Sequence, residues 1–499
     1  MPQSKRQSTG PNDTAACKLA RQDAADGAGW FKVVLPVAVI AACAELGTAI
    51  LNNSTLPLYF PKGLGMDTAL VGWLLIPFFI SEALFKSPLG CLADRIGRKP
   101  LMMAGASVTI FTPLLLMALQ YHPDSPSAIP VLIAFGLLRL LDGLGGAALW
   151  PALYAYIGDN VAEAKRGAAM ALLNMVYMLA LAVSFLVGGY ADDVFGPAFS
   201  EHAGVREQVT AIGHRVGEAA QNVNDHLHHR PARHDFGPVQ AALHQPGHYF
   251  PSFYLTSVLF GLAVLACAVG LKSNRPGAHT EDGTHEHEPL TWQAFMVSVR
   301  LVPQYIALAF VTFLGIGHIA PIVKLFAIDE FHLTEQRVGV LMLRTALIVA
   351  AVAYPLGHLA DKWGRARSVR LGFFLCALGL WGIPVLLKIQ AGGEIGFMVS
   401  AAIIGMGFVI AFPAWNALMT TLADAKQRGA VIGAVSAGQG MGVLVGFLSG
   451  ETLYKPRLIT MFSHTLHVGG HAVPFVLAAI LVTIGAVASL TAVRERRAP

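Results

Sequence analysis

Five ionisable residues lie inside long apolar stretches in the N-terminal third of the chain. They are Glu45, Glu82, Lys86, Arg139 and Asp142. An ionisable side chain at the centre of a membrane helix costs about 2.5–3.5 kcal/mol on insertion scales, so each is a candidate for function. A carboxyl group in a partly dehydrated cavity favours its protonated form, which is the property that a proton carrier requires.

Glu45 is the first candidate for proton coupling because its own helix offers no basic partner. It aligns with Thr48, Asn52 and Thr55 at i, i+3, i+7 and i+10, which predicts one polar stripe facing a cavity. Asp142 is the second candidate and Glu82 the third.

Four of the five charged positions form two pairs of opposite charge, each pair within reach on one helix. Glu82 and Lys86 stand at i and i+4, and Arg139 and Asp142 stand at i and i+3. Each pair has two open interpretations, a role in transport or an internally neutralised pair that holds helices together.

The C-terminal half differs, because we expect no acid in the middle of its membrane helices. It offers His318, Lys324 and Arg344. The two cations would make one side of a cavity positive, which favours an amphipathic or anionic cargo, or acids reaching across from the other half. His318 could titrate or could be a hydrogen-bonded packing residue.

Further polar and aromatic residues in the apolar stretches could line the cavity or simply pack. The full set of predicted cavity residues is Asn52, Lys86, Arg139, Asn174, Tyr177, His318, Lys324, Arg344, Trp415, Asn416 and Gln439.

The elements that position these residues are membrane helices. Hydrophobic residues make up 55% of 499 and charged residues 13%, where a soluble domain carries about 25%. Apolar runs long enough to cross a bilayer recur along the chain. We expect an all-α membrane protein with twelve spans, at 31–58, 70–91, 100–119, 129–154, 168–190, 252–271, 303–327, 338–358, 369–388, 396–418, 430–450 and 471–492.

An eleven-residue pattern occurs twice and divides the chain into two halves. Gly90–Pro100 and Gly357–Arg367 are 267 positions apart, and Val71-Gly72 matches Val338-Gly339 at the same offset. Each copy ends an apolar segment with an acid followed by bases. Because transport sites are commonly built between repeated halves, the repeat predicts a duplicated transporter body.

The predicted domain boundaries follow from the repeat and the polar segments. We expect two six-helix halves with tails and a linker, at 1–29, 30–271, 272–290, 291–493 and 494–499. Lys and Arg gather in the tails and in the loops after even-numbered spans, so both termini should be cytoplasmic in a cell inner (plasma) membrane.

These residues resemble the major facilitator superfamily, and within it the twelve-helix drug:proton antiporters. The resemblance covers nearly the whole chain and depends most on the repeated pattern. In that family this loop signature locks the halves together on the cytoplasmic side in the outward-open state, with its acid near the start of the eleventh helix. The resemblance therefore implies a cytoplasmic gate made of Gly90, Asp94, Arg95, Gly97, Arg98, Gly357, Asp361, Gly364 and Arg365.

The chain departs from the family pattern at two places. Asp142 stands where a neutral amide is usual, and only Gly188 and Gly189 survive of the antiporter signature in the fifth span. The Pro-Glu-Ser-Pro-Arg run of sugar porters is missing after the sixth span, so sugar transport ranks below efflux.

The long loop 191–251 carries eight of the 18 histidines, including His248. It is predicted as a solvated insertion containing one amphipathic helix, and no metal site is expected in the chain. A divalent-metal or pH-responsive surface is the alternative.

Together these features predict a secondary active transporter that works by alternating access, most simply by proton-coupled export of small amphipathic compounds. Proton-coupled uptake of an organic anion, and a non-transporting receptor or scaffold that uses the outer loop, are the alternatives. The expected partners are a small-molecule substrate and the lipid bilayer, with no nucleic acid, for a monomer that needs no cofactor beyond a proton gradient. No phosphate-binding loop, nucleophile elbow or metalloprotease motif occurs, so we do not expect an enzyme.

Overall fold

A computed structural model describes most of the chain. The described residues are 31–123, 125, 128–161, 163–200, 244–272, 300, 302–388, 393–419, 428–461 and 464–493. Their side chains are described except at 87, 91, 94, 163–168, 171, 174, 198, 200, 353–362, 388, 416, 417, 428–433 and 457–468. The predicted tails, the linker 272–290 except for Lys272, and the amphipathic helix of the loop lie outside the described residues.

The N-terminal half is built from six long helical segments. The first membrane helix, Phe31–Gly63, contains two π-helical turns, η1 (Ile50–Thr55) and η2 (Tyr59–Gly63), on either side of α2 (Leu56–Leu58). The others are α3 (Thr68–Ile96), α4 (Arg98–Ala118), α5 (Ala128–Asn160), α6 (Glu163–Ser200) and α9 (Phe250–Gly270), which the short helix η3 (Pro246–Tyr249) precedes.

The C-terminal half repeats this plan. Its segments are α11 (Pro303–Ile319) with α12 (Val323–Phe331), α13 (Glu335–Trp363), α14 (Arg365–Lys388), α15 (Gly393–Met419), α16 (Arg428–Tyr454) and α17 (Val473–Ala492). A short antiparallel hairpin of β1 (Arg457–Met461) and β2 (His464–Val468) connects the last two helices. This hairpin was not predicted from the sequence.

Twelve membrane helices account for the described structure. Nine are long and apolar enough to cross a membrane, and α11 with α12, bent by 42°, makes a tenth. The remaining two are α13 and α16. They pack against α6 and α3 of the other half. The predicted all-α fold of twelve spans is confirmed.

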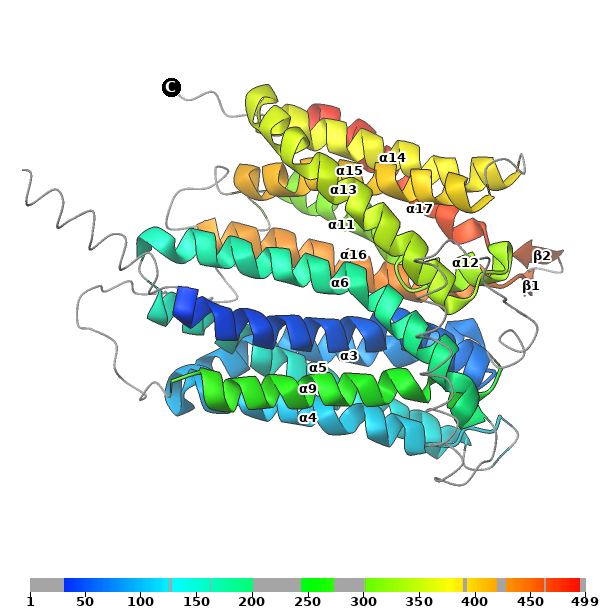
Figure 1. The fold of residues 1–499 in the computed structure, drawn as a ribbon. Helices are drawn as coiled ribbons and strands as arrows, with labels where there is room; N and C mark the ends of the chain where they lie inside the picture. Colours follow the sequence, from blue (N-terminus) through cyan, green and yellow to red (C-terminus); the bar gives the residue numbers. More distant parts are fainter. Residues whose placement is uncertain are drawn as a thin grey trace, which may run out of the picture.

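Figure 1 shows the helices as two stacked groups. The first helix, α3, α4, α5 and α9 form the lower group, and α11, α13, α14, α15 and α17 form the upper one. In this view α6 and α16 lie between them. We call the end that carries β1, β2 and α12 the hairpin end, and the end where α3 and α13 finish, at Gly97 and Gly364, the signature end.

The repeat has a structural meaning at both ends of α3 and α13. Asp67 and Thr334, 267 positions apart, are the N-caps: the Asp67 carboxylate accepts from Ala69 N and the Thr334 hydroxyl from Arg337 N. Gly97 and Gly364 end the same helices with φ of 102° and 88°, a conformation that favours glycine. The second glycine of each signature copy is therefore required by the turn into the next helix.

Two predicted boundaries were wrong around the long loop. The fifth span was expected to end at 190, but α6 continues to Ser200, and the short helix η3 lies inside the predicted loop. Asp192 and Asp193 interrupt the apolar pattern directly after the predicted end of the span at 190. Both are buried and accept backbone N–H groups, from Ser252 and Gln336.

The matched glycines of the repeat lie where the halves meet. Gly339 of α13 packs against α6, where an added Cβ would lie 2.5 Å from Leu186 Cα. Its counterpart Gly72 of α3 packs against α16, where a Cβ would lie 3.2 Å from the flexible side chain of Glu451. Small residues at these two crossings allow close helix contact between the halves.

Replacing Gly339 with Ala should open the hairpin end. The added methyl group overlaps backbone atoms of α6, and overpacking of this kind costs about 1–3 kcal/mol, which is about a 5- to 150-fold change in the ratio of open to closed forms. Spin labels at His122 and Ile395, exposed positions of the two halves, would report it as a longer distance by double electron–electron resonance. Gly261→Ala is the matched control, because nothing lies within 4 Å of its added Cβ. An unchanged distance distribution in Gly339→Ala would contradict this account of the crossing.

Candidate functional site

The halves share one hydrophobic core at the hairpin end and have separate cores at the signature end. The shared cluster joins Leu51, Tyr59 and Phe253 of the N-terminal half to Phe326 and Phe447 of the C-terminal half. At the signature end one cluster belongs to the N-terminal half and another to the C-terminal half. Among the described residues, the hairpin end is therefore closed while the halves are packed independently at the other end.

A group of buried ionisable residues joins the halves within this closed region. We call Asp192, Asp193, His248, Lys324 and Glu335 the interface ion cluster. The first three come from α6 and η3 of the N-terminal half, and the last two from α12 and the first turn of α13. None of the five is more than 8% exposed.

Lys324 makes the central contacts of the interface ion cluster. Its Nζ lies 2.5 Å from Glu335 Oε2 and donates to the Ser54 hydroxyl (2.7 Å) and carbonyl oxygen (3.0 Å). Gly188 allows this approach, because an added Cβ there would lie 2.7 Å from Ser54 Oγ. Removing one partner of a buried pair leaves an uncompensated charge, which typically costs about 3–5 kcal/mol. Lys324 and Glu335 both belong to the C-terminal half, so the contacts of Lys324 that join the two halves are those with Ser54.

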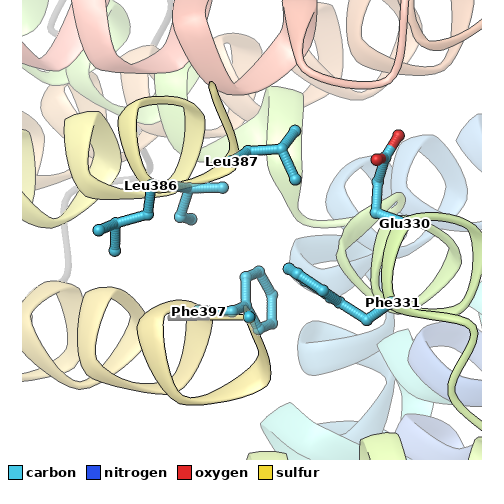
Figure 2. A pocket seen from close by; sticks show the side chains of 7 residues that line it. Glu330, Phe331, Leu386, Leu387 and Phe397 are labelled. Atoms are coloured by element: carbon cyan, nitrogen blue, oxygen red, sulfur yellow. The ribbon is translucent and has the colours of Figure 1, made fainter. Parts of the chain in front are cut away.

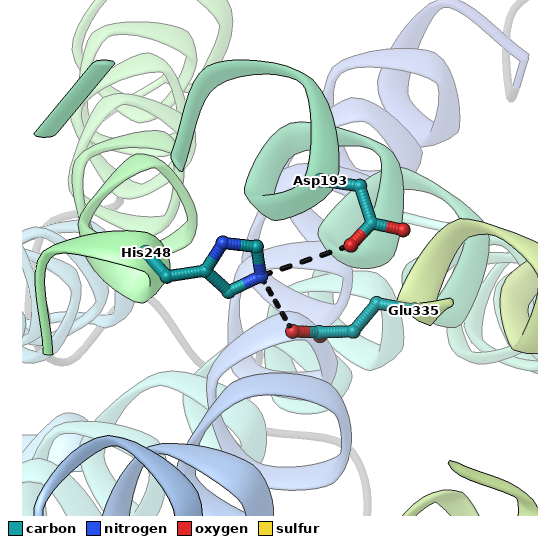
Figure 3. Close-up of side chains that lie close together, drawn as sticks. All are labelled: Asp193, His248 and Glu335. Carbon is teal, nitrogen blue, oxygen red and sulfur yellow. Dashed lines mark hydrogen bonds and ion pairs between the residues drawn. The ribbon is translucent and has the colours of Figure 1, made fainter. Parts of the chain in front are cut away.

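His248 connects Glu335 to the N-terminal half. Its Nε2 lies 3.1 Å from Glu335 Oε1 and 3.7 Å from Asp193 Oδ1, as Figure 3 shows. The other Asp193 oxygen accepts from Gln336 N at 2.6 Å. His248 is fully buried, so its assignment to a solvated loop was wrong.

A second ion pair lies between the halves nearer the hairpin. Lys62 Nζ is 2.5 Å from Asp329 Oδ1, and the Tyr454 hydroxyl donates to Asp329 Oδ2 at 2.9 Å. Lys62 and Asp329 are 267 positions apart, so the pair joins equivalent positions of the two repeats.

Arg139 and Asp142 form a buried cluster inside the N-terminal half. Arg139 Nη1 lies 2.6 Å from Asp142 Oδ2, the Thr112 hydroxyl donates to Asp142 Oδ1 at 3.1 Å, and Arg139 Nη2 donates to Asn52 Oδ1. The guanidinium also lies over the Phe78 ring, 4.7 Å from its centre. The predicted pairing is confirmed, and neither charge of the pair is left without a partner.

Glu45 lies apart from that cluster. It is 4% exposed and accepts a hydrogen bond from the Tyr177 hydroxyl of α6, with the charges of Glu82 and Lys86 near enough to act on it. Asn52, seven residues further along the first helix, lies in the π-helical turn that begins at Ile50 and contacts Arg139 of that cluster.

Glu82 and Lys86 form the predicted i, i+4 pair at 2.8 Å, with the Lys86 side chain 49% exposed. This pair is therefore the more accessible of the two predicted pairs in the N-terminal half. The charges of this pair are also the ones that interact electrostatically with Glu45.

Three predicted cavity residues have packing roles. Lys324 is enclosed by the interface ion cluster. Trp415 lies in the C-terminal core at the signature end, against Tyr305 and Phe373. His318 bonds to the Leu314 carbonyl oxygen at 2.7 Å and the Ser449 hydroxyl at 3.0 Å.

The other predicted positions are less constrained by the structure. Gln439 is half-buried on α16 and Arg344 is exposed on α13, while the side chains of Asn174 and Asn416 lie outside the description. In the signature loops the side chains of Asp94 and Asp361 are likewise not described, and Arg98 Nε lies 3.1 Å from Asp159. Arg95 and Arg365 are exposed, and Gly90 and Gly357 lie within α3 and α13.

Sequence reasoning missed the buried acids of the interface. Glu335 and Glu451 fell just outside the predicted spans, yet α13 begins at Glu335 and α16 continues to Tyr454, so both acids belong to the ends of these helices. Glu451 is 1% exposed. Thr334 is a typical N-cap residue and Glu335 a typical first-turn residue, so this pattern before an apolar run could have predicted that the helix begins at 335 instead of 338.

A cavity of about 290 Å³ lies at the hairpin end of the C-terminal half. Figure 2 shows Glu330 and Phe331 facing Leu386, Leu387 and Phe397 across it. Its lining comes only from the α12, α14 and α15 region, and Glu330 is bonded to His471 at 2.6 Å. It does not lie between the halves and is not a candidate for the transport site.

Two pseudo-symmetric six-helix groups with buried charges where they meet define a multi-pass membrane transporter. A model of the Major Facilitator Superfamily matches residues 37–200, 236–447 and 305–499. The chain belongs to this superfamily, whose members are transporters and not enzymes.

Similar proteins include several drug-resistance transporters. The multidrug resistance protein B homolog of Mycobacterium tuberculosis (strain CDC 1551 / Oshkosh) is 25% identical over 81% of this chain and 72% of its own. The class B tetracycline resistance protein of Escherichia coli is 24% identical over 79% of each chain. The match to the inner membrane transport protein YajR of Escherichia coli, 29% identical, spans only a quarter of either chain.

Solved structures share the fold at low identity. A D-xylose–proton symporter superposes with a TM-score of 0.64 at 13% identity, covering 93% of this chain and 98% of its own. A bacterial homolog of the lysosomal transporter Spinster, in an inward-facing and unoccupied conformation, has a TM-score of 0.64 at 14% identity, covering 92% and 96%.

Asp142→Asn should lower the free energy of unfolding in detergent by about 3–5 kcal/mol, because it leaves the Arg139 charge buried without its counter-ion. The double variant Arg139→Met with Asp142→Leu should recover most of that loss. Asp159→Asn, which removes a partly exposed ion pair with Arg98, should cost less than about 1 kcal/mol. Equal stability of Asp142→Asn and wild type in denaturant or thermal unfolding would show that the pair is not structurally required.

Proposed function

We propose that this transporter exports small amphipathic compounds in exchange for protons. The observation that carries the proposal is Glu45, a buried carboxyl group on the first helix whose described hydrogen-bond partner is a tyrosine hydroxyl. A buried carboxyl group without a directly bonded cation can bind and release a proton as its surroundings change.

The positions around Glu45 support coupling to a substrate. The partly exposed Lys86 and Glu82 lie near it on α3, and Tyr177 reaches it from α6. A cationic or polar substrate that disturbs these groups would change the stability of the Glu45 carboxylate. Substrate binding next to Glu45 would then be coupled to the release of its proton. Asp142 ranks lower as a coupling residue, because Arg139 and Thr112 both stabilise its charged form.

The closed hairpin end supports alternating access. The positive-inside rule favours a cytoplasmic signature end, with Arg98, Lys99 and Arg365 in the first turns of its helices and both termini on that side of the inner membrane. The described conformation would then be closed towards the outside. Opening of the hairpin end would require the interface ion cluster and the Lys62–Asp329 pair to separate.

The drug-resistance relatives support export of amphipathic compounds. The alternative of organic-anion uptake depended on Lys324 and Arg344, and Lys324 is neutralised by Glu335. That leaves Arg344 as the main argument for an anionic cargo. The receptor or scaffold alternative depends on loop residues outside the described structure.

Glu45→Gln should abolish substrate-triggered proton movement while leaving the protein folded, because the amide cannot take part in proton exchange at this position. The measurement is proton flux from proteoliposomes with an imposed pH gradient and a pH-sensitive dye, with panels of lipophilic cations and organic anions. Glu394→Gln, at the first turn of α15 and away from the interface, is the matched control.

The two panels distinguish the alternatives. Flux triggered by cations and lost in Glu45→Gln supports antiport, and flux triggered by anions would replace export by uptake. Substrate-triggered flux of wild-type size in Glu45→Gln would refute the assigned coupling residue.

A further inference from the structure

The strongest unassigned chemistry lies in the interface ion cluster. Asp193, His248 and Glu335 each direct one potential metal-binding atom to a common region, and these three atoms lie within 4.8 Å of one another. All three side chains are at least nine-tenths buried, and Asp193 Oδ1 has no hydrogen-bond partner among the described residues. An unpartnered buried carboxylate oxygen is unfavourable unless something not yet identified binds it.

The geometry suits a small divalent cation. Ligand atoms bound to Zn²⁺ at about 2.0–2.2 Å in a tetrahedral arrangement lie about 3.4 Å from one another. His248 Nε2 is 3.1 Å from Glu335 Oε1 and 3.7 Å from Asp193 Oδ1, on either side of that value (Figure 3). Only small side-chain movements would bring the three atoms to a shared ion.

In each carboxylate, the oxygen that does not face His248 is bound by another group, which fixes the orientation of the side chain. Gln336 N donates to Asp193 Oδ2 at 2.6 Å, and Lys324 Nζ lies 2.5 Å from Glu335 Oε2. The oxygens left over are the two that face His248. Outer partners that orient ligands in this way are characteristic of protein metal sites.

The charge balance favours a divalent ion over a monovalent one. With the neighbouring Asp192, the cluster holds three carboxylates and one ammonium group, while His248 binds a metal in its neutral form. The fixed groups therefore carry a net charge of −2 when all carboxylates are ionised, which one divalent cation balances. Nitrogen and carboxylate ligands together suit Zn²⁺ and Mn²⁺ better than Mg²⁺.

We propose that Asp193, His248 and Glu335 form a divalent transition-metal site that holds the hairpin end closed. Two ligands belong to the N-terminal half and one to the C-terminal half, so the complete site exists only while the halves are together. An ion that binds one conformation better shifts the population towards it. The site would make the transporter sensitive to Zn²⁺ or Mn²⁺ independently of its substrate.

The first test measures metal binding by the purified full-length protein after treatment with a chelator. Titration with Zn²⁺ and Mn²⁺ by calorimetry, and with Co²⁺ by visible absorption, should detect one tight site per chain, with Mg²⁺ much weaker. Asp193→Asn and Glu335→Gln should each weaken the affinity by about tenfold or more, since even loss of an outer partner costs about 10–100-fold. Glu330→Gln, from the exposed pair with His471, is the matched control and should leave the affinity unchanged.

Two further variants keep the result unambiguous. A chain with His226, His228 and His229 changed to Asn removes histidines of the long loop that could bind metal, and should retain the tight site. Asp193→Asn can keep its acceptor for Gln336 N, so it should fold even if Glu335→Gln does not. Absence of tight binding to folded wild type, equal affinity in Asp193→Asn, or loss of the site in the loop variant would overturn the proposal.

The second test asks whether the metal acts on conformation. Zn²⁺ should narrow the distance distribution between spin labels at His122 and Ile395 towards its short component in wild type, and should have no effect in Asp193→Asn. Binding without any such change would refute the role in closure. Neither test uses transport, so both remain decisive if the proposed export activity is wrong.

Discussion

The buried pair between Lys324 and Glu335 is the constraint on which the closed conformation depends. Both side chains are fully buried, and Lys324 also donates to Ser54 of the opposite half. A charge removed from water in this way is tolerated only while its partners are present. Separation of the halves must therefore be accompanied by water, protons or another ion reaching these groups. This makes the hairpin end a two-state element, either dry and fully paired or open and hydrated.

The rest of the interface is consistent with such a two-state element. One hydrophobic core crosses between the halves at the hairpin end, while each half keeps its own core at the signature end. Glycines at the crossings, Gly339 and Gly189 among them, bring backbones into contact without long side chains that would interlock. Each half can then rotate as a body, because its internal packing does not depend on the interface. Arg139 and Asp142 contribute to that internal rigidity, whereas Glu45 lies next to groups that are partly exposed.

The sequence predicted the architecture well because its signals are strong and local. Apolar length gave the twelve helices, and the 267-residue repeat matched Gly72 with Gly339 and one copy of the signature with the other. The i, i+3 and i, i+4 spacings gave both ion pairs within helices. The interface ion cluster could not be predicted in this way, because Asp193, His248 and Glu335 are far apart in sequence and each looked like a loop residue. Their burial depends on how two helices from different halves meet, and the π-helical turn Ile50–Thr55 is similarly invisible to a 3.6-residue period.

The most direct test of the account measures both ends of the molecule at once. In lipid nanodiscs, spin-label pairs would be placed across the hairpin end at His122 and Ile395 and across the signature end at Arg95 and Arg367, which are exposed. Wild type should give a short hairpin-end distance together with a long signature-end distance. Glu335→Gln, which leaves Lys324 without its counter-ion, should increase the first and decrease the second in the same samples. Distances that stay fixed at both ends, or that lengthen at both ends together, would contradict a transporter whose alternation depends on this buried pair.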